Sequence, residues 1–380
     1  MTDINIKETI ADESTDFNVK RFRIGNYKFE MPTKSIDINN TTQKLLDSNL
    51  REITSLAIEK SKLLKDISPI KSILDSSDEN AINSFFGKKN WAQDKFSSIT
   101  ISLKFNPLKY VKKIEDIEGF FDYYHSYSKD ALFIPNIWHK ASNDNIIDVE
   151  NYLKYVDSVY HILNSRNGKP IFVPISIKFS LNDLDKIISY YLKKEHFYIW
   201  IDFESKPINQ SVNAKLRRIN DILRKSGQFD KIITYYSNIK REILSNVKDV
   251  HDSPGSDILA STMGANFIGV NRDPQKFNPN SVGKQPSQKE MWVHKARKFN
   301  PETYYYEKQE VKAVKPKNEN ITVNARLLND ELKKQNDFFL EKQELGSYLQ
   351  HKKMLMDNSE IFRSIIREKQ KKIAQLKDFF

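Results

Sequence analysis

The stretch that decides the fold is PIFVPISIKFSLNDLDKIISYYLKKEHFYIWIDFE, residues 170–204. Within it, PIFVPISI (170–177) and FYIWIDFE (197–204) are short apolar runs without clean polar alternation, which is typical of strands buried on both faces. The segment between them, SLNDLDKIISYYLKKE (180–195), predicts a helix with a serine as its N-cap. Strand, helix and strand in this order predict a parallel sheet with a right-handed crossover.

The same alternation extends to both sides of this unit and gives six predicted strands. No glycine-rich dinucleotide or P-loop fingerprint follows any of them, which argues against a nucleotide-binding open sheet. We predict a (β/α)8-type (TIM-like) barrel, with the remaining strands supplied by residues 66–97 or 245–256; an open doubly wound sheet is the alternative. The other predicted strands are 98–107, 131–137, 231–238 and 265–271, and the other predicted helices are 114–127, 146–168, 213–227 and 257–264.

The residues before the barrel fall into three predicted parts. Residues 1–17 are polar and acidic, and we expect them to form a disordered arm. Residues 19–38 alternate apolar and charged side chains around a Gly-Asn turn, which predicts a β-hairpin. Residues 41–65 place leucine and isoleucine at helical spacing behind a threonine cap, which predicts one helix. Hairpin and barrel together are predicted to span 18–275.

Residues 276–380 are predicted to form an aromatic and basic excursion and then C-terminal helices, at about 324–349 and 361–379. The excursion interleaves cations with aromatic rings, a combination that binds unstacked bases. The alternative is a tail that packs its aromatic side chains on the barrel. The candidate nucleic-acid-binding residues are Trp292, Lys295, Arg297 and Lys298.

Charge and composition narrow the classes of function. The 380 residues include 61 Lys or Arg and 50 Asp or Glu, a net charge of +11, and a basic surface fits a polyanion such as tRNA or DNA. The alternative is a lysine-rich solvated face. The sequence contains no cysteine, which excludes disulfides and Cys-based zinc or iron–sulfur sites. No metal site is predicted, and the cofactor is unknown. Without an apolar leader or membrane-length run, we expect a cytoplasmic protein outside the membrane.

Candidate functional residues lie at the carboxyl ends of the predicted strands, because the loops of a parallel α/β fold converge there. The sharpest signal is Asp202 with Glu204, two acids on one face of a strand. Neighbouring carboxylates suit a general acid beside a nucleophile or a metal ligand; the alternative is that both are hydrated or cap the next helix. The other polar residues at strand ends are Lys104, Asn106, Asn136, Trp138, His139, Ser176, Lys178, Ser237, Asn238, Lys240, Asn271 and Arg272.

Three of these are further candidates for substrate contact or catalysis. The His139 imidazole could act as an acid or base or bind a ligand, although a lone histidine is often structural. Asn106 and Asn136 both lie beside proline at a strand end. Their amides could orient a polar substrate or only form Asx turns.

The densest local pattern is HDSPGSDILASTMGANFIGVNRDP, residues 251–274. Ser256 and Asp257 open a short helix whose free backbone N–H groups could hold an anion, unless one of them is simply the N-cap. Gly269 would let backbone or ligand approach the last strand. Arg272 at the strand end could bind a phosphate or carboxylate.

Two stretches resemble the tRNA-guanine transglycosylase superfamily, including its DNA-directed relatives. They are the hairpin with its Pro-Thr turn, RFRIGNYKFEMPTKSID (21–37), and the barrel end, GSDILASTMGANFIGVNR (255–272). The family's zinc site of three cysteines and a histidine, and its Gly-Gly-Leu substrate loop, have no counterpart in this sequence.

This resemblance implies a barrel enzyme that exchanges guanine for a 7-deazaguanine base, with an aspartate attacking the ribose C1′ atom and a second carboxylate. On the resemblance, Asp202 is the nucleophile, with Glu204 or His139 assisting. We therefore expect a nucleic-acid-associated barrel protein that acts as a base-exchanging transglycosylase. The alternatives are a non-catalytic scaffold for nucleic acid or a partner protein, and a small-molecule barrel enzyme with a phosphate site.

Overall fold

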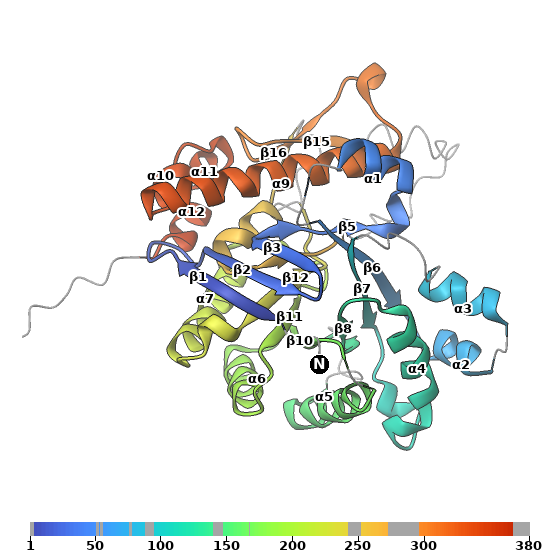
Figure 1. The fold of residues 1–380 in the computed structure, drawn as a ribbon. Helices are drawn as coiled ribbons and strands as arrows, with labels where there is room; N and C mark the ends of the chain where they lie inside the picture. The colour runs from blue at the N-terminus through green and yellow to red at the C-terminus, as the bar shows by residue number, and fades with distance from the viewer. Residues whose placement is uncertain are drawn as a thin grey trace, which may run out of the picture.

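The computed structural model describes residues 4–50, 53, 56–75, 78–87, 95–139, 147–166, 168–241, 252–272 and 296–367. Its core is a curled parallel sheet of six strands in the order β4-β14-β12-β11-β10-β8, with helices along its outer side (Figure 1). This confirms the predicted α/β class. The strands are β4 (Thr33–Lys34), β8 (Leu132–Phe133), β10 (Ile171–Ser176), β11 (Tyr198–Asp202), β12 (Ile233–Ser237) and β14 (Phe267–Ile268).

A second parallel sheet of four strands has the order β5-β6-β7-β9. Its strands are β5 (Ile36–Asp37), β6 (Ala57–Leu64), β7 (Phe96–Leu103) and β9 (Asn136–Ile137). Two stretches of chain contribute to both sheets: residues 33–37 supply β4 and β5, and residues 132–137 supply β8 and β9. The two sheets are therefore joined through the chain at both of these stretches.

Helices follow the strands in sequence, as the apolar runs predicted, and Figure 1 shows α4 to α7 on the outside of the strands. The predicted cap of α6 is confirmed, because the Ser180 hydroxyl accepts a hydrogen bond from the Asp183 backbone N–H at 3.2 Å. The helices are α1 (Gln43–Asn49), α2 (Ser68–Asp75), α3 (Glu79–Phe86), α4 (Glu118–Tyr127), α5 (Val149–Asn164), α6 (Leu181–Lys193) and α7 (Gln210–Lys225). The 3-10 turns include η2 (Pro107–Lys109), η3 (Ile114–Ile117) and η6 (Ile258–Met263).

The single helix predicted over 41–65 is wrong. Among the described residues of this stretch only those of α1 form an α-helix, and residues 57–64 form β6, which pairs with β7 from Ala57–Phe96 to Leu64–Leu103. The apolar spacing fits a helix locally, but burial between two parallel strands overrides this local preference. The described part of the ranges predicted to supply the missing strands adds no parallel strand of its own. Residues 68–75 and 79–86 form α2 and α3, residues 96–97 belong to β7, and β13 (Asp252–Pro254) is antiparallel in another sheet.

The N-terminal residues form a three-stranded antiparallel sheet. The predicted hairpin is present as β2 (Asn18–Ile24) and β3 (Tyr27–Met31), with Gly25 at φ +53° in the turn. The disordered arm predicted for residues 1–17 is wrong for residues 4–17, because β1 (Asn5–Ala11) pairs with β2. Asn5, Lys7 and Glu8 of β1 are exposed to solvent while the backbone of the strand completes the ladder.

Aromatic side chains join this N-terminal sheet to the parallel strands. The Phe29 ring lies 5.3 Å from that of Phe96 and 5.4 Å from that of Phe267, and Phe22 lies 5.9 Å from Phe267. All four rings are buried, together with Trp200 of β11. The sheet therefore packs against the amino ends of β7 and β14, away from the strand ends where functional residues were predicted.

The C-terminal part holds a small sheet and four helices. β15 (Arg297–Asn300) and β16 (Tyr305–Lys308) are antiparallel, and β13 pairs with β16. The first predicted helix is present but spans α9 (Lys317–Lys342), because Gln343 adopts a left-handed conformation and ends it early. The second overlaps only α12 (Ser359–Ile365), and residues 368–379 lie outside the described residues. The remaining helices are α10 (Gly346–Leu349) and α11 (Lys353–Asp357).

Along the parts of the chain that the structure describes, no helix combines the length and the apolar character needed to cross a bilayer.

Candidate active site

A fully buried carboxylate, Asp202 at the end of β11, is the centre of a polar cluster. Five hydrogen-bond donors from four separate chain segments converge on its two oxygens. An ionised carboxylate only accepts hydrogen bonds, so this environment suits the charged form of Asp202. The donors are Ser102 Oγ (2.8 Å), Asn136 Nδ2 (3.0 Å) and Trp138 Nε1 (2.8 Å) to Oδ2, and Asn238 Nδ2 (2.8 Å) and the Glu204 backbone N–H (2.9 Å) to Oδ1.

The second predicted carboxylate, Glu204, is also buried but has different partners. Its Oε1 atom accepts hydrogen bonds from the His139 backbone N–H at 2.9 Å and from the Ser176 hydroxyl. Its Oε2 atom lies 3.0 Å from Lys178 Nζ. Burial and, next, the negative charge of Asp202 raise the pKa of Glu204 to about 7, against the lowering effect of Lys178. A carboxyl group of this kind can both donate and accept a proton near neutral pH.

The backbone around the two carboxylates adopts conformations that are unfavourable for residues other than glycine. Glu204, Ser205 and Asn238 have φ values of 47°, 63° and 57°, in the left-handed region. Hydrogen bonds between the two loops hold them there, including the bond from Ser205 N–H to the Asn238 carbonyl at 2.9 Å. Strained residues that cluster in this way are more common at functional sites than elsewhere.

Arg272 was predicted to bind an anion, but its guanidinium supports Asn238 instead. Its Nε atom donates to Asn238 Oδ1 at 2.9 Å, and its Nη2 atom donates to Ser61 Oγ at 2.8 Å. Because Asn238 in turn donates to Asp202, Arg272 orients the amide that holds the central carboxylate. Ser61 belongs to β6, the strand that was predicted as a helix.

The His139 imidazole does not contact either carboxylate in the described structure; only its backbone N–H does. The ring lies 5.3 Å from the Phe179 ring and lines a surface groove between α5 and α6. Burial, followed by the charge of Lys178, lowers the pKa of His139. The arrangement therefore gives the imidazole no contact through which to assist Asp202.

The two predicted asparagines have different roles. Asn136 joins the central cluster, where its amide donates to Asp202 and its carbonyl oxygen accepts from the Tyr152 hydroxyl at 3.0 Å. Asn106 caps a 3-10 turn, with its side chain accepting from the Leu108 backbone N–H at 3.0 Å. That is the Asx-turn alternative, so only Asn136 lies at the site.

At Ser256 and Asp257, where an anion site was predicted, protein acceptors take the backbone N–H groups that precede the turn, and anion binding there stays a prediction. The Gly255 N–H donates to the Tyr304 carbonyl at 2.8 Å, and the Ser256 N–H donates to the Arg241 carbonyl at 2.7 Å. The Asp257 carboxylate accepts hydrogen bonds from the Tyr306 hydroxyl at 2.8 Å and from the Asn271 amide. Both residues are fully buried: Asp257 bonds to Tyr306 of β16, and the Ser256 hydroxyl accepts a hydrogen bond from the Ile208 backbone N–H.

The predicted nucleic-acid-binding residues are only partly described. Trp292 and Lys295 lie outside the described residues. Arg297 and Lys298 are on β15, which packs against α9; Lys298 is exposed and Arg297 is half-buried. Binding of nucleic acid by this stretch stays a prediction.

The strand-end reasoning missed a further buried carboxylate, Glu59 of β6. It accepts hydrogen bonds from the Tyr235 hydroxyl at 2.8 Å, the Val270 backbone N–H at 2.6 Å and the Thr100 hydroxyl. Burial raises the pKa of Glu59 above its usual value. Correct recognition of β6 as a strand would have placed Glu59 on the face that Ser61 also occupies.

Gly269 lies where its sequence position predicted a close approach. A Cβ atom added there would be 2.5 Å from Glu59 Oε2 and 2.6 Å from Tyr235 Cε1. We expect Gly269→Ala to lower the free energy of unfolding by about 2 kcal/mol, since the strands must shift to relieve the overlap. Gly119→Ala, whose Cβ would meet only Leu74 Cδ2 at 3.1 Å, is the control and should change stability by less than about 1 kcal/mol in urea unfolding. Equal effects of the two substitutions would contradict this packing argument.

Within the described residues, no group of three or more His, Asp or Glu side chains is placed to hold a metal ion. Comparison with protein-family models and with curated proteins gives no match for this chain.

Proposed function

We propose that the two parallel sheets form one closed (β/α)8 barrel. The pairings that support it run β5-β6-β7-β9 along one sheet and β8-β10-β11-β12-β14-β4 along the other. Residues 33–37 and 132–137 each supply a strand to both sheets, and Ser98 also forms a parallel bridge with Ala131. Counting each shared stretch once gives eight parallel strands, with α1 to α7 and α9 as the surrounding helices.

We further propose that this barrel protein is a base-exchanging transglycosylase that acts on a nucleoside in nucleic acid. The observation that carries the proposal is the convergence of β7, β9, β11 and β12 on two buried carboxylates with different environments. The net charge of +11 favours a polyanionic substrate. Lys104 and Lys178 lie 5.4 and 5.9 Å from the Trp138 ring, which places two cations beside Asp202.

In the proposed reaction, an Asp202 oxygen attacks C1′ of the nucleoside and the C1′–N bond breaks. The departing base keeps the bonding electron pair and takes a proton from Glu204. The incoming base then gives a proton to Glu204, its nitrogen attacks C1′, and the bond to Asp202 breaks. For the attack, one donor to Oδ2, such as Ser102, must release its hydrogen bond.

Glu204→Gln tests this assignment without removing the bulk of the side chain. We expect base exchange to fall at least about 100-fold, the usual contribution of a general acid or base. Because the pKa of Glu204 is about 7, wild-type kcat/KM should decline as pH rises past this value and the acid loses its proton. Radiolabelled guanine exchange into tRNA and into DNA, followed from pH 5 to 9, measures both effects.

Lys186→Gln, at a lysine on the outer helix α6, is the matched control and should retain full activity. Affinity for tRNA or DNA should be unchanged in Glu204→Gln, which separates catalysis from binding. Wild-type exchange activity in Glu204→Gln, or an unchanged pH profile, would exclude Glu204 as the proton-transfer group.

A non-catalytic scaffold is the second candidate, and one observation favours it. Asp202 accepts five hydrogen bonds and has no exposed surface. These features are expected of a residue that organises the strand ends as much as of a nucleophile. This alternative predicts nucleic-acid binding without base exchange. Binding that weakens steeply with salt, in a protein with no exchange on either polynucleotide, would favour the scaffold.

A further inference from the structure

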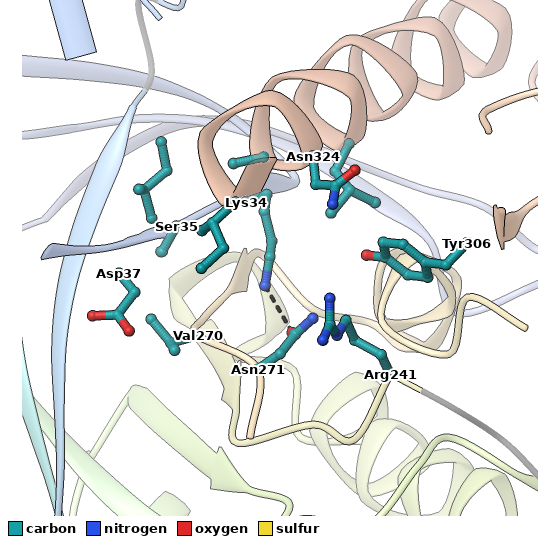
Figure 2. Close-up of a pocket in the computed structure, with 12 residues that line it drawn as sticks. Lys34, Ser35, Asp37, Arg241, Val270, Asn271, Tyr306 and Asn324 are labelled. Atoms are coloured by element: carbon teal, nitrogen blue, oxygen red, sulfur yellow. Dashed lines mark hydrogen bonds between the residues drawn. The ribbon is translucent and has the colours of Figure 1, made fainter. Parts of the chain in front are cut away.

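A second polar cavity lies beside the strand ends, separate from the residues that contact Asp202. It has a volume of about 130 Å³, close to the roughly 150 Å³ of a cavity that holds a benzene ring. Its walls come from the end of β4 and β5, the chain after β12 and after β14, and α9 (Figure 2). One wall is apolar, and the other carries Lys34, Arg241 and Asn271. We call it the Lys34–Arg241 pocket.

Two cations enter this pocket from opposite sides. Lys34 is only 6% exposed, and its Nζ atom donates to Asn271 Oδ1 at 2.9 Å and to the Gly269 carbonyl. Figure 2 shows the Arg241 guanidinium and Lys34 Nζ pointing toward the same space beside Asn271. The Arg241 guanidinium also lies 5.4 Å from the Tyr306 ring, which restricts its position. A buried lysine and a fixed guanidinium on one cavity favour an anionic ligand.

The acids near the pocket have hydrogen-bond partners of their own, and Glu59 also interacts electrostatically with Lys34. Asp257 accepts from the Tyr306 hydroxyl and the Asn271 amide, and Glu59 accepts from Tyr235, Thr100 and the Val270 N–H. Asp37 lines the pocket, but its carboxylate accepts from the Asn39 N–H at 2.8 Å and points away from the two cations in Figure 2. Of the described charged side chains that line the pocket, Lys34 and Arg241 therefore point toward the space beside Asn271, and Asp37 does not.

We propose that the Lys34–Arg241 pocket binds a phosphoryl group. A guanidinium can bind two phosphate oxygens at once, and the lysine ammonium can contact a third. The position agrees with this on the proposed barrel, because the loops after the last two strands of such barrels often bind phosphate, and Arg241 follows β12 while Asn271 follows β14. The phosphoryl group comes either from a small phosphomonoester or from a polynucleotide backbone.

Titration of the full chain with inorganic phosphate, followed by calorimetry, tests the proposal. Arg241→Gln should weaken phosphate binding at least about tenfold, which is what one lost charge-assisted hydrogen bond predicts. Arg241 is the better target because Lys34 bonds to the sheet backbone and its removal could prevent folding. Arg218→Gln is the control: Arg218 of α7 forms an exposed ion pair with Asp185 of α6, and this variant should bind phosphate like wild type.

Two competitors then identify the source of the phosphoryl group. Displacement of phosphate by a nucleoside 5′-monophosphate alone indicates a small ligand, and displacement by an oligonucleotide without terminal phosphates indicates the backbone. Absence of phosphate binding at 50 mM, or equal binding by wild type and Arg241→Gln, would overturn the proposal. Glu204→Gln should bind phosphate normally, so the failure of either proposal is distinguishable from that of the other.

Discussion

Asp202→Asn is expected to lower the free energy of unfolding by about 4 kcal/mol, because it breaks a buried and fully bonded charged centre. An asparagine side chain has only one acceptor oxygen. Its NH2 group would face donors that bond to a carboxylate oxygen in the wild type. With the amide nitrogen in place of Oδ2, Asn136 and Trp138 would each be left with a buried N–H group facing another donor, and with it in place of Oδ1 the same would hold for Asn238 and the Glu204 backbone N–H. Urea unfolding of the variant and the wild type at pH 7 measures the difference.

Asp185→Asn gives the matched control for this measurement. Asp185 forms an exposed ion pair with Arg218 at 2.6 Å, and such pairs contribute about 1 kcal/mol or less. If Asp202→Asn were as stable as Asp185→Asn, Asp202 would not organise the strand ends. Loss of activity in Asp202→Asn alone is therefore weak evidence for a nucleophile, which is why Glu204→Gln is the sharper catalytic test.

The repeated strands and helices could be predicted from the sequence because each segment carries its own signal. Apolar runs such as 171–176 and 198–202 are buried on both faces, so their composition alone separates them from amphipathic helices. Residues 57–64 lack this signal, since AIEKSKLL contains charged side chains. Glu59 can occupy a buried strand position because Tyr235, Thr100 and the Val270 N–H donate hydrogen bonds to its carboxylate. None of these partners is close to Glu59 in sequence.

The location of the candidate site could also be predicted, but not the role of each side chain. The rule that polar residues gather at strand ends identified Asp202, Glu204 and Asn136 before their partners were known. It could not show that Arg272 would bond to Asn238, or that only the backbone of His139 would reach Glu204. Those contacts depend on loop conformation, including the left-handed residues after β11 and β12.

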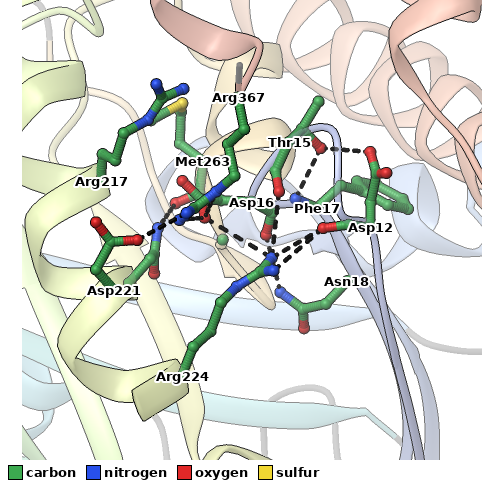
Figure 3. Close-up of polar contacts among 12 residues, drawn as sticks. Asp12, Thr15, Asp16, Phe17, Asn18, Arg217, Asp221, Arg224, Met263 and Arg367 are labelled. Carbon is green, nitrogen blue, oxygen red and sulfur yellow. Dashed lines mark hydrogen bonds and ion pairs between the residues drawn. The ribbon is translucent and has the colours of Figure 1, made fainter. Parts of the chain in front are cut away.

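Another buried carboxylate, Asp16, joins the two ends of the described chain. Arg367 bonds to its Oδ1 atom through Nε at 3.0 Å and through Nη2, and Arg224 lies 3.7 Å away (Figure 3). Arg367 also forms an ion pair with Asp221 of α7 at 2.7 Å, and its backbone N–H donates to the Ser14 carbonyl at 2.7 Å. The cluster therefore connects the segment after β1, helix α7 and the segment after α12.

We expect Asp16→Ala to lower the free energy of unfolding by about 4 kcal/mol, because it leaves two arginines facing each other without the buried carboxylate between them. Arg367→Ala should cost less, about 2 kcal/mol, since its side chain is 22% exposed and Arg224 still neutralises Asp16. The loss of stability in the double variant should be smaller than the sum of the two single losses by about 1–3 kcal/mol, as expected for residues in direct contact.

Asp330→Ala, in an exposed pair with Arg326, controls for loss of a surface carboxylate and should change stability by less than about 0.5 kcal/mol. Strict additivity in urea unfolding would show that Asp16 and Arg367 contribute independently, and the proposed connection between the chain ends would then have no energetic basis.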